Sequence, residues 1–450
     1  MRVTRAEPVL VHAAGDVPAA DEYYFLSNLD QNVAVLMKTV HVFSPSRARD
    51  DAAAVIKGAL GSKGVAGPQA TRAMAWGVGK KLSLYVKKNQ KVLVHYYPFQ
   101  GSLVVGADDG RLWVRNDRRG VPFVVANADC ELKEVGDVVL SAPDAGAVQG
   151  QLVFVGRGDK DDDKLGAPLL SVQVTRFRCG GFVLGLAMNH CLADGVAAAE
   201  FLRSWAEMAR GVPLSSPPFL DRTVLRARTS PTVAFPHEEF AEMEDVSGLL
   251  DEPRVHRAFA MDAGRLARLK RQASACSTFV ALTAFVWRAT SRAMRMRPEQ
   301  KSKLMFAVDG RRRVDPPLPP GFCGNAVVFA CCVSTAGDLL GGPVSAAARW
   351  IQDAIRRTDD AFIRSAIDYV EVGDGRAPSM TATTLVTAWN RLGFHAADFG
   401  WGEAAQSGPA ELPRGEVVMF MRDVRDSSIV LLLGLPQSCM QEFQDMVDLI

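Results

Sequence analysis

The chain has 450 residues, of which 48% are hydrophobic and 23% charged, which is the usage of an average globular protein. With 52 Lys and Arg against 50 Asp and Glu, the formal net charge of +2 excludes a strongly basic nucleic-acid-binding protein. No apolar run approaches the ~18–20 residues of a membrane span. At about 100–200 residues per domain, this length predicts two domains.

The first half of the chain predicts strands and helices in alternation. Val33–Phe43 and Val92–Tyr96 are rich in β-branched and apolar residues and are predicted to be strands. Asp50–Gly61 has helical spacing and ends at a glycine. Leu169–Arg178 and Gly181–Met188 predict a hairpin of two buried strands around a Cys-Gly turn.

The second half repeats this alternation after a different kind of segment. A helix is predicted over Val196–Arg210, and Gly211–Pro253 is too rich in proline for regular structure. Further helices are predicted over Ala263–Ala273 and Ser277–Arg292, and strands over Val327–Val333, Val417–Met421 and Ile429–Leu435. We therefore expect an α/β protein with domains over residues 1–210 and 256–450, joined by a crossover over residues 211–255.

Several common functional motifs are absent from the sequence. There is no G-x-S-x-G nucleophile elbow, no complete P-loop and no H-E-x-x-H zinc motif. Gly158–Gly166 alternates aspartates as a calcium loop does, but Lys164 and Leu170 replace the required glycine and glutamate. We expect a solvated loop there and no metal site. Eight scattered cysteines without a C-x-x-C pair, together with an amino terminus that lacks a secretory signal, predict reduced thiols and a cytoplasmic location.

One histidine follows a buried strand. His190 begins the string H-x-x-x-D-G, which ends at Asp194 and Gly195. Imidazole has a pKa near 6.5 and can accept a proton at neutral pH. Asp194 could orient the ring, or it could turn away and hold the loop through an ion pair. A purely structural histidine is the alternative.

A second motif follows about half a chain later. Asp398-Phe399-Gly400-Trp401-Gly402 predicts a rigid loop, because two glycines flank the tryptophan. In the order and the separation of these two motifs, H-x-x-x-D-G and D-F-G-W-G, the sequence resembles the plant BAHD acyltransferases. Five further segments resemble the family in the same order: Leu26–Gln31, Val92–Gln100, Ser277–Arg288, Asp309–Ala326 and Thr387–Trp389.

This resemblance implies two chloramphenicol-acetyltransferase-like domains, each a mixed β-sheet with helices. A channel would run between them and admit a coenzyme A thioester from one face and the acceptor from the other. Coenzyme A would be a substrate, and no cofactor would be bound permanently. The partners would be small molecules, without nucleic acid, and the protein would be a monomer.

The resemblance also implies roles for individual residues. His190 would take the proton from the acceptor and later protonate the coenzyme A thiolate. Thr387 and Trp389 would position the oxyanion, and Asp194 would pair with Arg311. Asp398, Gly400, Trp401 and Gly402 would form a structural loop. Ser277 and Thr278 would be candidates to bind coenzyme A. We expect Cys191 to be a packing residue, since free cysteine usually behaves as a small hydrophobe.

The ends of the chain most resemble family members that feruloylate ω-hydroxy fatty acids and fatty alcohols. The function predicted is transfer of a hydroxycinnamoyl group, such as feruloyl, coumaroyl or caffeoyl, to such a hydroxyl. Transfer to shikimate or quinate, or to an amine such as spermidine, is the alternative. Asp374 stands where shikimate-type members carry an arginine, although Arg376 is close. A silent acyl-CoA-binding relative and a thioesterase are two further hypotheses.

Overall fold

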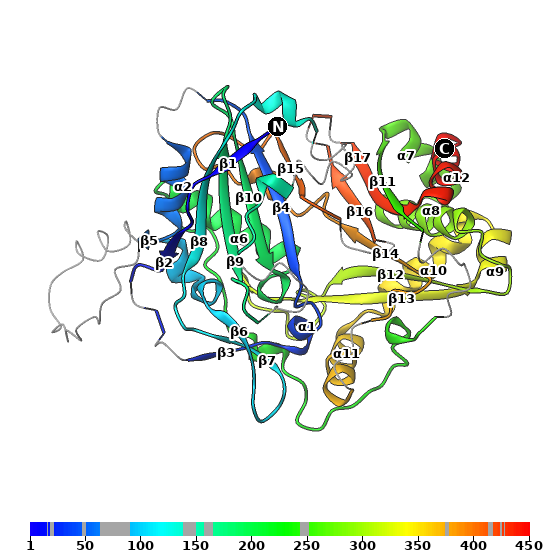
Figure 1. Ribbon diagram of the computed structural model, residues 1–450. Helices are drawn as coiled ribbons and strands as arrows, with labels where there is room; N and C mark the ends of the chain where they lie inside the picture. Colours follow the sequence, from blue (N-terminus) through cyan, green and yellow to red (C-terminus); the bar gives the residue numbers. More distant parts are fainter. Residues whose placement is uncertain are drawn as a thin grey trace.

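Two large mixed β-sheets lie beside each other in the computed structural model (Figure 1). The structure describes residues 1–15, 17–18, 22–46, 51–63, 91–137, 150–156, 165–243, 252–373, 378–412, 417–423, 425–426 and 428–450. The predicted loop at Gly158–Gly166 lies largely outside these residues, and Asp374 and Arg376 lie wholly outside them.

The first sheet has eight strands, in the order β15-β4-β10-β9-β8-β2-β5, with β1 beside β8. Its strands are β1 (Val3–Arg5), β2 (Val9–His12), β4 (Leu36–Phe43), β5 (Ser62–Lys63), β8 (Val121–Ala128), β9 (Leu170–Arg176), β10 (Phe182–Asn189) and β15 (Gln406–Pro409). Only β8 and β9 pair in parallel. The predicted hairpin is confirmed, since β9 pairs antiparallel with β10.

Two helices cover the outer face of the first sheet, α2 (Ala52–Leu60) and α6 (Gly195–Ala209). Each begins at an aspartate whose carboxylate accepts a backbone N–H, Asp51 for α2 and Asp194 for α6. Both helices were predicted from their apolar spacing. Trp205 of α6 is fully buried against the sheet and donates to the Ile56 carbonyl of α2 at 2.9 Å.

The second sheet has the order β11-β17-β16-β14-β12-β13 and is also mixed. Its strands are β11 (Arg254–Met261), β12 (Lys301–Asp309), β13 (Val327–Thr335), β14 (Thr383–Ala388), β16 (Val417–Arg422) and β17 (Ile429–Pro436). Helices α7 (Ala263–Gln272), α8 (Thr278–Ala293), α9 (Ala336–Gly341), α10 (Val344–Arg357), α11 (Asp360–Val372) and α12 (Gln437–Asp448) accompany it. Five of these elements were predicted, namely α7, α8, β13, β16 and β17.

A third, small sheet has the order β3-β7-β6 and lies below the first sheet in Figure 1. Its strands are β3 (Tyr23–Phe25), β6 (Ser102–Val105) and β7 (Leu112–Arg115), and the short helices α1 (Asn28–Gln31) and α4 (Val92–His95) lie close in sequence. The prediction of a strand over Val92–Tyr96 is wrong. Val92, Leu93, Tyr96 and Phe99 are all buried, and their spacing places them on one side of a helix.

The two halves of the chain are not separate in space. The crossover after α6 is irregular as predicted, with the short 3-10 helices Arg222–Leu225 and Glu238–Phe240 among its described residues. Strand β15 comes from the second half of the chain yet pairs antiparallel with β4 at the edge of the first sheet. Among the described residues, three hydrophobic cores lie between successive layers: one between the helices and the first sheet, one between the two sheets, and one between the second sheet and its helices.

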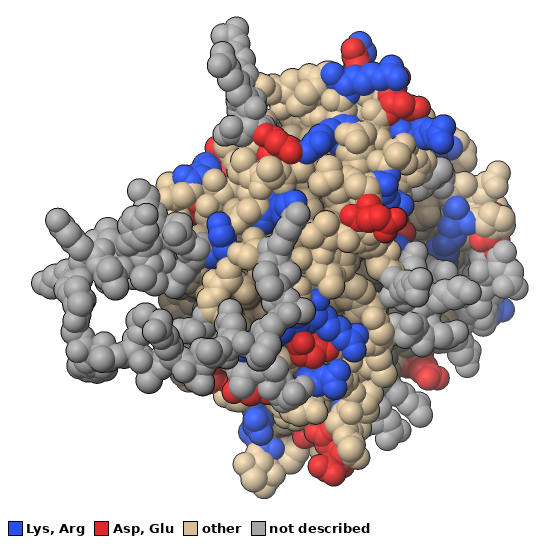
Figure 2. Space-filling model, turned by 60° about the vertical axis from the view of Figure 1, so that its left-hand side comes forward, with Lys and Arg blue, Asp and Glu red and all other residues tan. Residues whose placement is uncertain are grey.

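The charges on the surface are mixed. Figure 2 shows basic and acidic side chains interspersed over the face that it presents, in keeping with a net charge of +2. Within the described residues, no helix is both long and apolar enough to cross a membrane.

Candidate active site

A cavity of about 330 Å³ lies where the two sheets meet. Strands β4 and β10 and helix α6 line it from the first sheet, and β12, β13, β14 and β16 line it from the second. Most of its walls are aliphatic or aromatic. The polar side chains in the walls are Thr39, His190, Asp194, Asp309, Asn325 and Thr387, together with the indole of Trp389.

His190 enters this cavity from the end of β10, where a 3-10 turn (His190–Leu192) begins. Its backbone N–H donates to the carbonyl of Val35 at 2.8 Å, and its carbonyl accepts from Nδ2 of Asn325 at 2.8 Å. Nδ1 of its ring has no hydrogen-bond partner among the described residues. The backbone of His190 is thus held from both sides, while the residue lines the cavity.

Burial lowers the pKa of His190 below its ordinary value. The negative charges of Asp194 and Asp30 act in the opposite direction, but their effect is smaller. The imidazole is therefore neutral at neutral pH, the form that can accept a proton.

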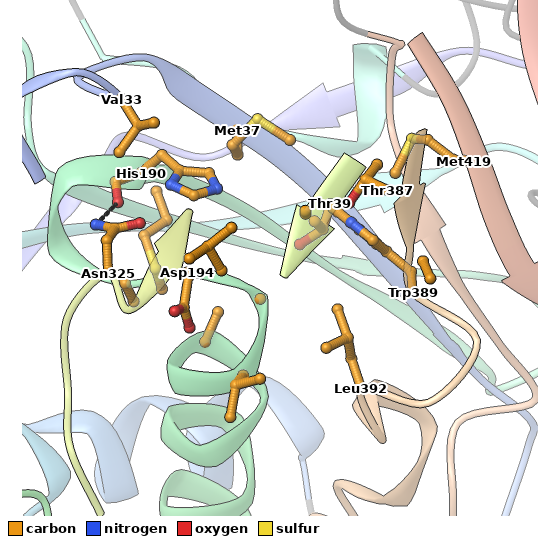
Figure 3. Close-up of a pocket in the computed structure, with 18 of the residues that line it drawn as sticks. Val33, Met37, Thr39, His190, Asp194, Asn325, Thr387, Trp389, Leu392 and Met419 are labelled. Atoms are coloured by element: carbon orange, nitrogen blue, oxygen red, sulfur yellow. Dashed lines mark hydrogen bonds between the residues drawn. The ribbon is translucent and has the colours of Figure 1, made fainter. Parts of the chain in front are cut away.

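Asp194 does not orient the imidazole. Oδ1 caps α6 by accepting the N–H of Ala197 at 3.0 Å, and Oδ2 accepts the N–H of Ala326 at 3.0 Å. Both oxygens also bind the guanidinium of Arg311, at 2.9 and 2.8 Å. Figure 3 shows the carboxylate turned away from the imidazole. The predicted ion pair is confirmed. It ties α6 to the segment after β12, and the hydrogen bond from Ala326 ties α6 to the start of β13.

Thr387 and Trp389 lie across the cavity from His190 (Figure 3). Thr387 is on β14, and Trp389 directly follows that strand. The backbone N–H of Trp389 donates to the carbonyl of Phe420 at 2.8 Å. The Trp389 ring packs on Phe394 with centroids 5.4 Å apart. The cavity thus has a base on one wall and hydrogen-bond donors on the opposite wall.

The D-F-G-W-G loop lies outside the cavity walls. Oδ1 of Asp398 accepts the N–H groups of Gly400 and Gly402 at 2.7 and 2.8 Å, and Oδ2 binds Arg210 at the end of α6. Both glycines have positive φ, at 107° and 86°, which a residue with a Cβ rarely adopts. Trp401 contacts Phe182 of the first sheet. This geometry fits a structural loop.

Three other predicted residues lie apart from the chemistry. Ser277 caps α8 by accepting the N–H of Val280 at 3.3 Å, and neither Ser277 nor Thr278 lines the cavity. Cys191 is fully buried, and burial raises the pKa of its thiol. It is therefore protonated at neutral pH, unlike a thiolate nucleophile.

No role was predicted from the sequence for Thr39, His41 or Asn325. Oγ1 of Thr39 lies 3.2 Å from Nε2 of His41, and Nδ1 of His41 lies 3.0 Å from Oγ of Ser407 on β15. Burial lowers the pKa of His41 to about 4. Asn325 belongs to a segment that resembles the family, but Thr39 and His41 sit in an unremarkable strand pattern. Their grouping depends on the pairing of β15 with β4.

The described residues contain no group of three or more His, Cys, Asp and Glu side chains that could hold a metal ion. The polar groups of the cavity suit organic substrates: one neutral base, two hydroxyls, an amide, an indole N–H and two carboxylates. Such a set can move protons and stabilise a developing oxyanion.

Comparisons with known proteins show the family of the chain and agree with this fold. A family model described as "Transferase family" matches residues 88–450. The chain belongs to this family, that of the BAHD acyltransferases. The fatty alcohol:caffeoyl-CoA acyltransferase of Arabidopsis thaliana is 44% identical over 454 residues, which cover 99% of this chain and 98% of the relative.

Two further comparisons support the same assignment. The omega-hydroxypalmitate O-feruloyl transferase of Arabidopsis thaliana is 42% identical over 462 residues, covering 99% of this chain and 92% of that protein. The crystal structure of vinorine synthase is 20% identical, covers 100% of this chain and 98% of its own, and has a TM-score of 0.73. This structural similarity confirms the predicted fold of two α/β domains.

Proposed function

We propose that the protein transfers a hydroxycinnamoyl group, such as feruloyl, coumaroyl or caffeoyl, from its coenzyme A thioester to the hydroxyl of an ω-hydroxy fatty acid or a fatty alcohol. The observation that carries the proposal is a neutral histidine that lines an apolar cavity between two sheets. The names of the two Arabidopsis relatives support the donor and acceptor classes.

The proposed reaction is a direct transfer without an acyl-enzyme. The His190 imidazole accepts the acceptor's hydroxyl proton while the hydroxyl oxygen bonds to the thioester carbonyl carbon. The resulting oxyanion needs positioned donors, and the Trp389 indole N–H and the Thr387 hydroxyl are the candidates. The carbon–sulfur bond then breaks, and the imidazolium returns its proton to the coenzyme A thiolate. The products are an ester and free coenzyme A.

The remaining predicted residues act through structure in this proposal. Asp194 and Arg311 hold the turn that carries His190, and the Asp398 loop supports α6 from outside the cavity. Ser277 and Thr278 stay proposed contacts to coenzyme A, since the positive end of α8 begins there. The cytoplasmic location, the monomeric state and the domain boundaries at residues 210 and 255 are proposals too.

The walls of the cavity favour an alkyl acceptor. Each buried CH₂ group contributes about 0.8 kcal/mol, and most lining side chains are apolar. The charged side chains in the walls, Asp194 and Asp309, are both acidic, and Asp309 is 46% exposed. Both of these carboxylates pair with Arg311, and no Lys or Arg is among the described residues that line the cavity. The carboxylate of shikimate would lie close to its reacting hydroxyl and would be buried there without a cation to pair with. In an ω-hydroxy fatty acid, the carboxylate is a full chain length away.

The test is kcat/KM for transfer from feruloyl-CoA to a graded series of primary alcohols and ω-hydroxy acids, beside shikimate and spermidine. We expect kcat/KM to rise with chain length until the cavity is filled. A higher value for shikimate or spermidine than for every alcohol would contradict the acceptor class. Without any alcohol, rapid release of ferulic acid would indicate a thioesterase, and no turnover with any acceptor would indicate a silent binding protein.

A further inference from the structure

The turn that carries His190 is held by its carbonyl groups. Three consecutive carbonyls in this turn each accept a side-chain hydrogen bond. The carbonyl of His190 accepts from Asn325, while those of Cys191 and Leu192 accept from Nη1 and Nη2 of Arg222. Because Nδ1 of the imidazole has no partner among the described residues, the direction of the ring depends on how firmly this backbone is held.

Arg222 reaches this turn from the crossover between the two halves of the chain. Its side chain is 1% exposed, and its Nε donates to the carbonyl of Cys323 at 3.1 Å. Its guanidinium lies 5.0 Å from the ring centroid of Tyr24. A buried cation needs a nearby anion, and Asp30 supplies it at 3.1 Å from Nη1.

Asp30 connects Arg222 to the other donor on the turn. Its carboxylate is completely buried, and Oδ2 accepts the N–H and the hydroxyl of Ser27, both at 2.7 Å. Oδ1 accepts the N–H and Nδ2 of Asn325, at 2.9 and 2.8 Å. This Nδ2 also donates to the carbonyl of His190. Helix α1, the crossover and the segment before β13 thus meet behind the His190 turn.

We infer that Arg222 and Asp30 are positioning residues for the transfer reaction, an inference that rests on the proposed role of His190 as the base. Neither side chain lines the cavity, so neither contacts the substrates. Together with Asn325, they fix the three carbonyls of the turn and thereby the direction of the imidazole. A misplacement of about 1 Å can cost on the order of 100-fold in rate.

The test is Arg222→Lys, with Arg288→Lys as the matched control. Lysine keeps the cation beside Asp30, but it cannot hold two carbonyls in the planar fork of a guanidinium. Arg288 likewise donates to three carbonyls, those of Leu339, Leu340 and Gly342, but it does so on the far side of the second sheet. Both variants therefore lose the same kind of hydrogen bond, and only one loses it at the His190 turn.

For Arg222→Lys we expect kcat to fall roughly 10- to 100-fold, with KM for feruloyl-CoA and for the alcohol within about twofold of the wild type. The assay is run below the unfolding temperature of each variant, and Arg288→Lys should keep the wild-type kcat. A wild-type kcat in folded Arg222→Lys protein, or equal losses in both variants, would overturn the inference. Wild-type protein that forms no ester would contradict the proposed function instead.

Asn325→Ser provides a second variant in case Arg222→Lys does not fold. It removes the donor to the His190 carbonyl and leaves the buried charges of Arg222 and Asp30 paired with each other. The same fall in kcat is expected. A wild-type kcat in this variant would also overturn the inference.

Discussion

His190 differs from the histidine of a hydrolase triad in how it is held. A triad histidine is oriented through its ring by a carboxylate, whereas Asp194 here binds Arg311, Ala197 and Ala326. The orientation of His190 comes from its backbone, and its neutral form comes from burial. The two properties can be tested separately: the neutral form by the pH dependence of activity, and the orientation by substitution of the residues that hold the backbone.

The pH dependence of kcat/KM should report the lowered pKa of His190. The neutral imidazole is the active base, so activity is lost only when the ring is protonated. Because burial lowers this pKa from its ordinary value of 6.5, the midpoint of the acid limb of kcat/KM should lie below pH 6.5. An acid limb with its midpoint above 6.5 would contradict this assignment.

Folding stability needs a control over the same pH range. The unfolded chain binds protons at His190 and His41 that the folded chain, with lowered pKa values, does not bind. The free energy of unfolding therefore falls as the pH drops below the unfolded pKa, near 6.5. Circular dichroism at each pH separates this loss of folded protein from titration of the base.

Residues brought together from distant segments were the hardest to predict. The family resemblance includes the segments that contain His190, Asp194 and Arg311, and the ion pair that it implied between Asp194 and Arg311 is present. Arg222 is in a proline-rich segment with no motif, and Thr39 is one of several polar residues in a strand. The role of Arg222 depends on hydrogen bonds to carbonyls 30 and 31 residues away in the sequence. The place of Thr39 depends on its neighbour His41, which contacts Ser407 of β15.

At the scale of elements, apolar periodicity predicted α2, α6, α7, α8 and the hairpin of β9 and β10, but it gave no prediction for α10, α11, α12, β8 or β12. It failed at Val92–Tyr96, where a short apolar run fits either a strand or a helix. It also gave no sign that β15, with the sequence Gln-Ser-Gly-Pro, would join a sheet. Hydrogen bonds to β4 place β15 there, and such pairing depends on tertiary structure.

The ion pair between Asp194, at the start of α6, and Arg311, just after β12, gives a prediction for stability. Asp194→Asn keeps the helix cap but removes the negative charge beside Arg311, whose side chain is only 14% exposed. Breaking a buried ion pair costs roughly 3–5 kcal/mol. We expect a lower free energy of unfolding and lower activity, and Arg311→Gln should have the same effects.

Chemical denaturation of Asp194→Asn, Arg311→Gln and Asp309→Asn tests this prediction. Asp309 also binds Arg311, but it is 46% exposed, so its loss should cost less than about 1 kcal/mol. If Asp194→Asn keeps wild-type stability and loses activity, Asp194 acts on His190 itself, and the structural assignment is wrong.

At the scale of the whole molecule, the site exists only because the two halves of the chain meet. His190 comes from the first sheet, and Thr387 and Trp389 come from the second. The sequence predicted the two α/β halves and the residues on each. The shape and apolar lining of the cavity depend on packing between the sheets, which periodicity within one element does not report.

Ester formation by His190→Ala protein tests the central claim most directly. Purified wild-type and variant proteins are incubated with feruloyl-CoA and a long-chain primary alcohol, and the alkyl ferulate and free coenzyme A are quantified by mass spectrometry. Circular dichroism confirms that both proteins are folded. We predict equal amounts of ester and coenzyme A from the wild type, and a rate about 10²–10⁴-fold lower from the variant. Ester formation at the wild-type rate by folded His190→Ala protein would contradict the account.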